Sequence, residues 1–182
     1  MDGVPAGLAR PWTVVADEIG RTLDAVDETR FAAVLEEFRD LPRRWFVTGQ
    51  GRSGLAGHMF AMRLMHLGRR VHVVGETTAP SVRSGDGLLI VSGSGRTPVS
   101  LHFAEIARAE GARVVLLTSQ PASPLTELAD LTLVLPTSGS TQLGGSQFEQ
   151  SALLVLDALV LALAVDVEDA PGVLAHLHTN LQ

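Results

Sequence analysis

The sequence predicts a doubly wound α/β fold, with a five-stranded parallel sheet in the order 2-1-3-4-5 and helices on both faces. Three observations support this prediction. Short, nearly continuous apolar runs alternate with helical segments, as is typical of parallel strands buried on both faces. The 182 residues suit a single domain, 1–182. The first and third apolar runs are each followed by a Gly-rich loop that carries hydroxyl groups.

The predicted elements follow one another in a regular order. An N-terminal helix is expected over about 13–38, where apolar residues recur at helical spacing and Thr13 can cap the first turn. Helices are also predicted at about 53–67, 98–110, 124–129 and 147–164, and the last begins a C-terminal helix and tail over about 147–182. The five predicted strands are Trp45–Thr48, Val71–Val74, Leu88–Val91, Val114–Thr118 and Leu131–Leu135.

The composition excludes several kinds of chemistry. Without any Cys, the chain has no disulfide, no thiolate nucleophile and no thiolate-bound metal. All 14 basic residues are Arg, so a Schiff-base lysine and a Walker-type phosphate lysine are absent as well. The net charge of −6 argues against nucleic acid as the main partner. No two His have the spacing of a zinc site, and we expect no metal.

The longest apolar run predicts a buried helix, not a membrane span. Ala152–Val165 is shorter than the roughly 20 residues that cross a bilayer, and Asp157 interrupts it. The N-terminus lacks the pattern of a secretory signal, so we expect a soluble cytoplasmic protein without membrane contact. Because the helix at 147–164 is apolar on nearly every face, part of it is expected to pack against another subunit in a homo-oligomer.

The loop after the third strand predicts a phosphate site. Ser92-Gly93-Ser94-Gly95-Arg96-Thr97 combines glycines, which let backbone amides approach a ligand, with three hydroxyl groups. Thr97 followed by Pro98 has the pattern of an N-cap and a first helical residue. Free amides at a helix N-terminus bind anions. The alternative is a plain strand-to-helix turn, although a turn does not require the two hydroxyls before the cap.

The loop after the first strand, Gly49–Gly54, matches G-x-G-x-x-G, which also occurs in dinucleotide-binding folds. Glu76, at the end of the second strand, stands near the position of a ribose-binding acid. However, Arg52 and Ser53 place polar groups where dinucleotide folds pack small apolar ones. Ser53 is therefore a candidate phosphate ligand, with a helix cap as the alternative.

Two residues are candidates for proton transfer. Glu149 lies at the start of the last long helix, where it is either a general base at the rim of the sheet or the second half of a capping box with Ser146. His66 lies near the end of an apolar helix, where it is either an acid/base group or a structural histidine.

Several stretches together resemble the sugar isomerase (SIS) domain family and, within it, the 6-phospho-3-hexuloisomerases of the ribulose monophosphate pathway. The resemblance covers about Trp45 to Gln182. The matching stretches are Gly51-Arg52-Ser53-Gly54, Ala61-Met62-Arg63-Leu64-Met65-His66-Leu67-Gly68, Val74-Gly75-Glu76-Thr77-Thr78, Ser92-Gly93-Ser94-Gly95, Thr118-Ser119, Ser123-Pro124-Leu125, Phe148-Glu149-Gln150 and His178-Thr179-Asn180-Leu181. The serine loop marks the wider family, whereas the second and third stretches are more specific to the hexuloisomerases.

The resemblance implies interconversion of D-arabino-hex-3-ulose 6-phosphate and D-fructose 6-phosphate without metal or organic cofactor, usually in a tetramer. It implies that Ser53, Ser92, Ser94 and Thr97 bind the phosphate, in a site that also includes Gly51 and Arg52. Glu149 and His66 are implied as the acid/base groups, with the histidine supplied by a neighbouring subunit. The rival expectations are a non-catalytic sugar-phosphate sensor, another aldose–ketose phosphate isomerase and a dinucleotide oxidoreductase.

Three positions depart from the family pattern. Gln50 replaces a small residue, Arg96 replaces an acidic or small residue, and Gln182 ends the chain where the family has Glu. None of the three is at the position of the implied base.

Overall fold

The computed structural model describes residues 10–137 and 139–181 and contains a five-stranded sheet. Every strand pair is parallel, and the order is β2-β1-β3-β4-β5, as predicted. The strands are β1 (Trp45–Gly49), β2 (Val71–Val73), β3 (Gly87–Val91), β4 (Arg113–Thr118) and β5 (Leu131–Val134). All five lie within one or two residues of the predicted runs, because each run is both apolar and bounded by turn residues.

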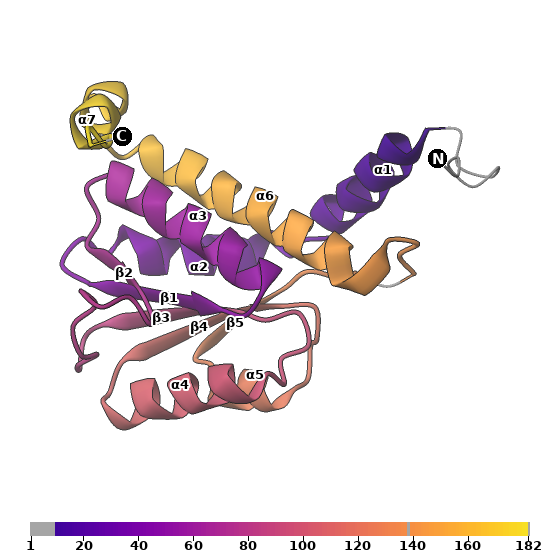
Figure 1. Ribbon diagram of the computed structural model, residues 1–182, viewed down its shortest axis with the longest axis horizontal. Coiled ribbons are helices and arrows are strands. Elements are labelled where there is room, and N and C mark those ends of the chain that lie inside the picture. The colour runs from indigo at the N-terminus through magenta and orange to yellow at the C-terminus, as the bar shows by residue number, and fades with distance from the viewer. Residues whose placement is uncertain (1–9, 138, 182) are drawn as a thin grey trace.

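Helices cover both faces of the sheet (Figure 1). On one face, α2 (Glu28–Arg39), α3 (Arg52–His66) and α6 (Ser146–Ala164) enclose a core that includes Phe38, Phe60 and Leu156. On the other face, α4 (Pro98–Ala109) and α5 (Pro124–Leu128) enclose a smaller core. Each strand therefore buries side chains in both directions, which explains its continuous apolar sequence.

The N-terminal region forms two helices, so the prediction of one helix over about 13–38 is wrong. Helix α1 (Pro11–Asp24) ends before Asp27, whose carboxylate accepts a hydrogen bond from the amide of Arg30 at 2.9 Å and begins α2. Thr13 does not cap α1, since its hydroxyl donates to the carbonyl of Arg10 at 2.7 Å. The break lets α1 contact α6 while α2 contacts β5.

Helix α6 has the features of a core helix. With the preceding turn, Leu143–Ala164 is the one helix in the described part of the chain that is long and apolar enough to cross a membrane, but half of its most apolar window is buried inside the domain. It packs along α3, as Figure 1 shows. The prediction of a buried helix is confirmed for that half. The exposed half includes Leu154 and Leu161.

The chain ends with α7 (Ala170–Leu177), which contacts α3. The domain prediction extends over 1–182, and its residues 1–9, 138 and 182 lie outside the described residues.

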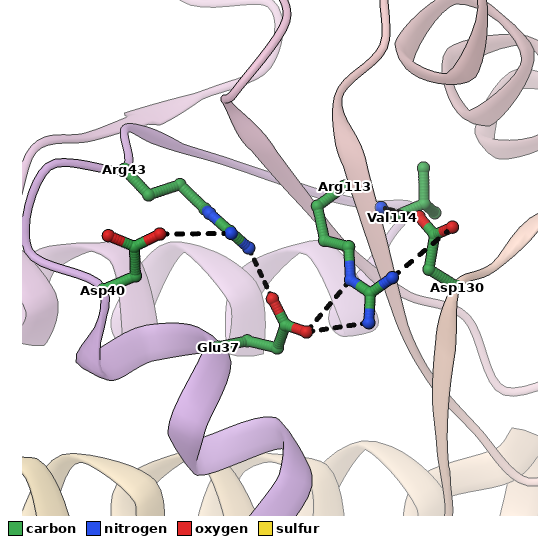
Figure 2. A network of polar contacts seen from close by, with 6 residues as sticks. All are labelled: Glu37, Asp40, Arg43, Arg113, Val114 and Asp130. Carbon is green, nitrogen blue, oxygen red and sulfur yellow. Dashed lines mark hydrogen bonds and ion pairs between the residues drawn. The ribbon is translucent and has the colours of Figure 1, made fainter.

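A network of charged side chains joins α2 to the amino-terminal edge of the sheet (Figure 2). Glu37 of α2 accepts hydrogen bonds from Arg43 and from Arg113, whose Nε lies 3.0 Å from the carboxylate. Arg113 also reaches Asp130 at 3.7 Å, and the amide of Val114 donates to Asp130 at 2.7 Å. These contacts fix α2 against the start of β4, at the edge opposite the carboxyl ends of the strands.

Candidate functional site

A polar cavity of about 400 Å³ lies at the carboxyl ends of the central strands. Loops after β1, β3, β4 and β5 and the start of α6 line it. This is the switch point between β1 and β3, where their connections leave toward opposite faces of the sheet. The polar side chains that line it are Gln50, Ser53, Ser92, Ser94, Thr97, Ser119, Gln120, Thr137 and Glu149.

Glycines shape the loop after β1. A Cβ on Gly54 would lie 2.7 Å from the backbone oxygen of Gly49, so only glycine lets α3 start this close to the strand. Gly51 is the N-cap of α3 with φ +58°, a conformation that favours glycine. Ser53 is consequently not the N-cap, and its side chain lines the cavity. Gly51 itself is not among the lining residues.

The serine loop after β3 is held by the end of β4. The carbonyl oxygen of Gly93 accepts hydrogen bonds from the hydroxyls of Ser119 at 2.8 Å and Thr118 at 3.2 Å. Thr97 occupies the predicted N-cap of α4, but its side chain makes no capping hydrogen bond. Its hydroxyl lies 3.3 Å from that of Ser92, and both line the cavity. These two hydroxyl groups therefore lie where a ligand can reach them.

Three helices begin at the cavity. The loops that precede α3 and α4 line it, as do Gly145, which caps α6, and Phe148 in its first turn. The first amides of a helix lack partners within the helix, and the aligned peptide dipoles make this end electropositive. Three such ends, with hydroxyl groups between them, form an environment suited to a phosphate.

Glu149 is an ion-pair partner and not part of a capping box, so the capping alternative is wrong. Gly145 is the N-cap of α6, and the hydroxyl of Ser146 donates backwards to the carbonyl of Leu143 at 2.7 Å. The carboxylate of Glu149, 12% exposed, lies 2.5 Å from Nε of Arg52. Oε1 of Glu149 is buried, and the guanidinium of Arg52 is the charged group beside it.

Arg52 links α3 to α6 at the rim of the cavity. In addition to Glu149, its Nη1 donates to the hydroxyl of Ser146 at 2.8 Å. Of the predicted site residues, the structure therefore brings Ser53, Ser92, Ser94, Thr97 and Glu149 into one cavity, with Arg52 in contact with Glu149.

His66 lies away from this cavity within the same chain. It is the last residue of α3, whereas Ser53 lies in the first turn, and the two are about 20 Å apart along the helix axis. His66 is buried, its ring stacks on that of His178 with the centroids 5.4 Å apart, and its Nδ1 has no hydrogen-bond partner among the described residues. Burial, followed by the charges of His178 and Arg63, lowers the pKa of His66, so its imidazole is neutral at pH 7.

Four polar lining residues were not predicted as site residues, namely Gln50, Ser119, Gln120 and Thr137. Ser119 and Gln120 follow β4 directly, and Thr137 lies shortly after β5. Their positions at the carboxyl ends of predicted strands are a signal that could have identified them. Glu76 lies elsewhere, beside a more apolar cavity of about 320 Å³ that α4 helps to line. Glu76 therefore does not line the polar cavity, where a ribose-binding acid would be expected.

The fold, with a hydroxyl-lined cavity at its switch point, defines a class of doubly wound α/β proteins that are suited to bind an anionic ligand there. A family model for the SIS domain matches residues 41–162. The chain belongs to the SIS domain family.

Comparison with individual proteins gives more specific information than the family model. The chain is 40% identical over 178 residues to a 3-hexulose-6-phosphate isomerase of Mycobacterium gastri, covering 93% of this chain and 89% of that protein. A 3-hexulose-6-phosphate isomerase of Bacillus subtilis (strain 168) is 40% identical over 147 residues, which cover 75% of this chain and 79% of that protein. The structure is also similar to the crystal structure of a Methanococcus jannaschii protein, for which a function of 3-hexulose-6-phosphate isomerase was inferred. The two structures superpose with a TM-score of 0.84 over 94% of this chain and 99% of that one, and the sequences are 31% identical.

Proposed function

We propose that the chain is a 6-phospho-3-hexuloisomerase that interconverts D-arabino-hex-3-ulose 6-phosphate and D-fructose 6-phosphate. The observation that carries this proposal is the cavity at the switch point, where serine and threonine hydroxyls meet three helix N-termini and one carboxylate. The relatives named 3-hexulose-6-phosphate isomerase, which match most of the chain, support the same substrate class. As the substrate is a charged intermediate of metabolism, we place the reaction in the cytoplasm and, by resemblance, in the ribulose monophosphate pathway of formaldehyde assimilation.

The phosphate would be bound by the hydroxyls of Ser53, Ser92, Ser94 and Thr97. These groups surround the N-termini of α3 and α4, so hydrogen bonds and helix dipoles act together on the anion. The phosphate is remote from the carbons that react. Its binding energy orients the sugar for proton transfer at those carbons.

The reaction moves a carbonyl from C3 to C2. A base removes the proton from C2 to form a 2,3-enediol, a proton passes between the two oxygens, and a proton returns at C3. Glu149 is our candidate for the base, because it is the one carboxylate among the described residues that line the cavity. Arg52 forms an ion pair with that carboxylate and holds it in place.

The proton between the oxygens would be carried by His66 of a second copy of the chain. Within one chain, α3 separates His66 from the cavity. A surface on which a second copy can pack is present, since the exposed apolar residues Leu55, Met59, Met62 and Met65 of α3 adjoin α6 with its exposed Leu161. We propose a homo-oligomer, by resemblance a tetramer, that covers this surface.

A coupled assay, with hexulose phosphate supplied and fructose 6-phosphate detected, tests the proposal directly. Glu149→Gln keeps the size of the side chain and is expected to lower kcat by about 10²–10⁴-fold. Glu105→Gln, on the exposed surface of α4, is the control and should retain normal turnover. Near-normal kcat in Glu149→Gln would remove Glu149 as the base. Sugar-phosphate binding without turnover in the unaltered chain would favour a sensor.

A further inference from the structure

A buried glutamate of α1 contacts the segment 139–147, which leads into α6. The side chain of Glu18 is 1% exposed, and none of the ion pairs found in the described part of the chain includes it. A carboxylate without a cationic partner can be buried only if hydrogen-bond donors surround it. The identity of those donors therefore indicates what Glu18 does.

In the described part of the chain, the hydrogen bonds to the Glu18 carboxylate come from three consecutive residues. Oε1 accepts from both the amide and the hydroxyl of Thr141, each at 2.7 Å. Oε2 accepts from the hydroxyl of Ser140 at 2.7 Å and from Nε2 of Gln142 at 2.9 Å. Four neutral donors thus converge on one carboxylate and fix the backbone of the segment.

Helix α1 also holds both ends of the connection between β5 and α6. The hydroxyl of Thr22 donates to the carbonyl of Pro136 at 3.3 Å, just after β5. At the other end, Nε2 of Gln147 donates to the carbonyl of Glu18 at 3.0 Å and to the hydroxyl of Thr22 at 2.9 Å. One face of α1 therefore holds this connection at its start, in its middle and at the first turn of α6.

The same connection forms a wall of the candidate site. Thr137, Gly144 and Gly145 line the cavity, followed by Phe148 and Glu149 of α6. The glycines have positive φ values of 62° and 82°, a conformation that other residues rarely adopt. Apart from Ser146, which contacts Leu143 and Arg52, the hydrogen bonds that join this stretch to another helix in the described part of the chain come from α1. Displacement of the segment would move the cavity wall and the first turn of α6 together.

We infer that Glu18 is a positioning residue for the ligand site, because its carboxylate fixes the segment 139–147 in the place where that segment completes the cavity. This inference deepens the proposed function and rests on it for the identity of the ligand, a sugar phosphate. The donors favour the ionised carboxylate, and their hydrogen bonds lower the pKa of Glu18 to about 2. The carboxylate is therefore ionised at neutral pH.

Glu18→Gln tests this inference with little change of shape. The new amide NH₂ would stand where an oxygen accepts from Gln142, so two donors would face each other. We expect KM for the sugar phosphate and Kd for inorganic phosphate to rise about tenfold, with kcat changed about threefold or less. Hydrogen exchange should accelerate in residues 139–147 and stay unchanged in β3 and β4. Asp17→Asn, an exposed neighbour on α1, is the matched control and should alter none of these values.

Unchanged KM and Kd in Glu18→Gln would overturn the inference, even if the variant were less stable. If Glu18→Gln does not fold, Thr141→Val decides, since it removes one donor and leaves α1 intact. It should raise Kd for phosphate about threefold, and an unchanged Kd would overturn the inference. If the unaltered chain does not convert hexulose phosphate, the proposed function fails, whereas the phosphate Kd and the exchange pattern still decide the role of Glu18.

Discussion

At the scale of single residues, the distance between backbones determines where glycine is required. Gly54 and Gly20 both lie inside helices, yet their surroundings differ. A Cβ at Gly54 would meet the backbone of Gly49 at 2.7 Å, whereas a Cβ at Gly20 would meet nothing within 4 Å. The first glycine is needed for packing of α3 on β1, and the second is not.

Substitution of these glycines should consequently have opposite effects. Gly54→Ala is expected to lower the free energy of unfolding by about 1–3 kcal/mol, because the backbone must shift to accept the methyl group. Gly20→Ala should raise it by about 0.4–1 kcal/mol, since alanine reduces the freedom of the unfolded chain. Urea unfolding of the two variants measures both changes, and equal changes of the same sign would contradict this interpretation.

The Glu18 carboxylate makes stability depend on acid. Its pKa falls from an ordinary 4.5 to about 2 on folding, so its ionised form stabilises the folded chain above the unfolded pKa. This contribution decreases as the pH falls from about 4.5 and is lost once the pH passes below the folded pKa, near 2. The difference in unfolding free energy between the unaltered chain and Glu18→Gln, measured across this range, should shrink with falling pH. A constant difference would contradict the assignment.

At the scale of elements, contacts between side chains connect helices to particular edges of the sheet. Arg52 and Glu149 join the N-termini of α3 and α6 at the carboxyl edge, beside the cavity. Glu37 and Arg113 join α2 to β4 at the amino edge (Figure 2). Loss of the Arg52–Glu149 contact is therefore expected to lower activity, whereas loss of the Glu37–Arg113 contact is expected to lower stability alone.

Glu37→Gln tests the stabilising role of the second contact. Glu37 is largely buried and serves two arginines, so its loss should lower the free energy of unfolding by about 1–3 kcal/mol. Glu36→Gln, which breaks an exposed pair with Arg39 on the same helix, should change it by about 0.5 kcal/mol or less. Both variants should retain normal turnover, because the network lies at the edge opposite the cavity. A larger loss of turnover than of stability in Glu37→Gln would contradict this division.

At the scale of the whole molecule, α3 and α6 expose large apolar side chains on their outer faces. Met62 is 49% exposed and Leu161 73% exposed, although both lie on helices whose other faces fill the core. Contiguous apolar surface of this kind is typical of an interface between subunits. In the homo-oligomer proposed above, we expect His66 of one copy to reach the cavity of another.

Met62→Glu should therefore reduce both assembly and turnover. A charge on the proposed interface is expected to shift the mass seen by light scattering toward that of one chain, 19.3 kDa, and to lower kcat in parallel. Ile106→Glu places the same charge on an exposed apolar residue of α4, on the opposite face of the sheet, and should alter neither. Unchanged mass in Met62→Glu would contradict the proposed interface.

The sequence alone was sufficient to predict the architecture of the sheet and its helices. Apolar runs such as Leu88–Val91 and the Gly-rich loops beside them are local signals, and parallel strands with helical connections admit few arrangements. The same loops placed Ser53, Ser92, Ser94 and Thr97 at one edge of the sheet before any contact was known. The structure agrees on both points.

Only the tertiary structure decided the partners of individual side chains. The sequence around Glu149 allowed either a general base or a capping box with Ser146, whereas the structure shows no such capping box and pairs the carboxylate with Arg52 of another helix. The break between α1 and α2 serves contacts with α6 and β5 that are remote in sequence. Glu18 resembles a surface residue in the sequence, yet donors more than 120 positions away bury it. Local patterns report how a segment folds, but the free energy of a buried charge depends on groups that only folding brings together.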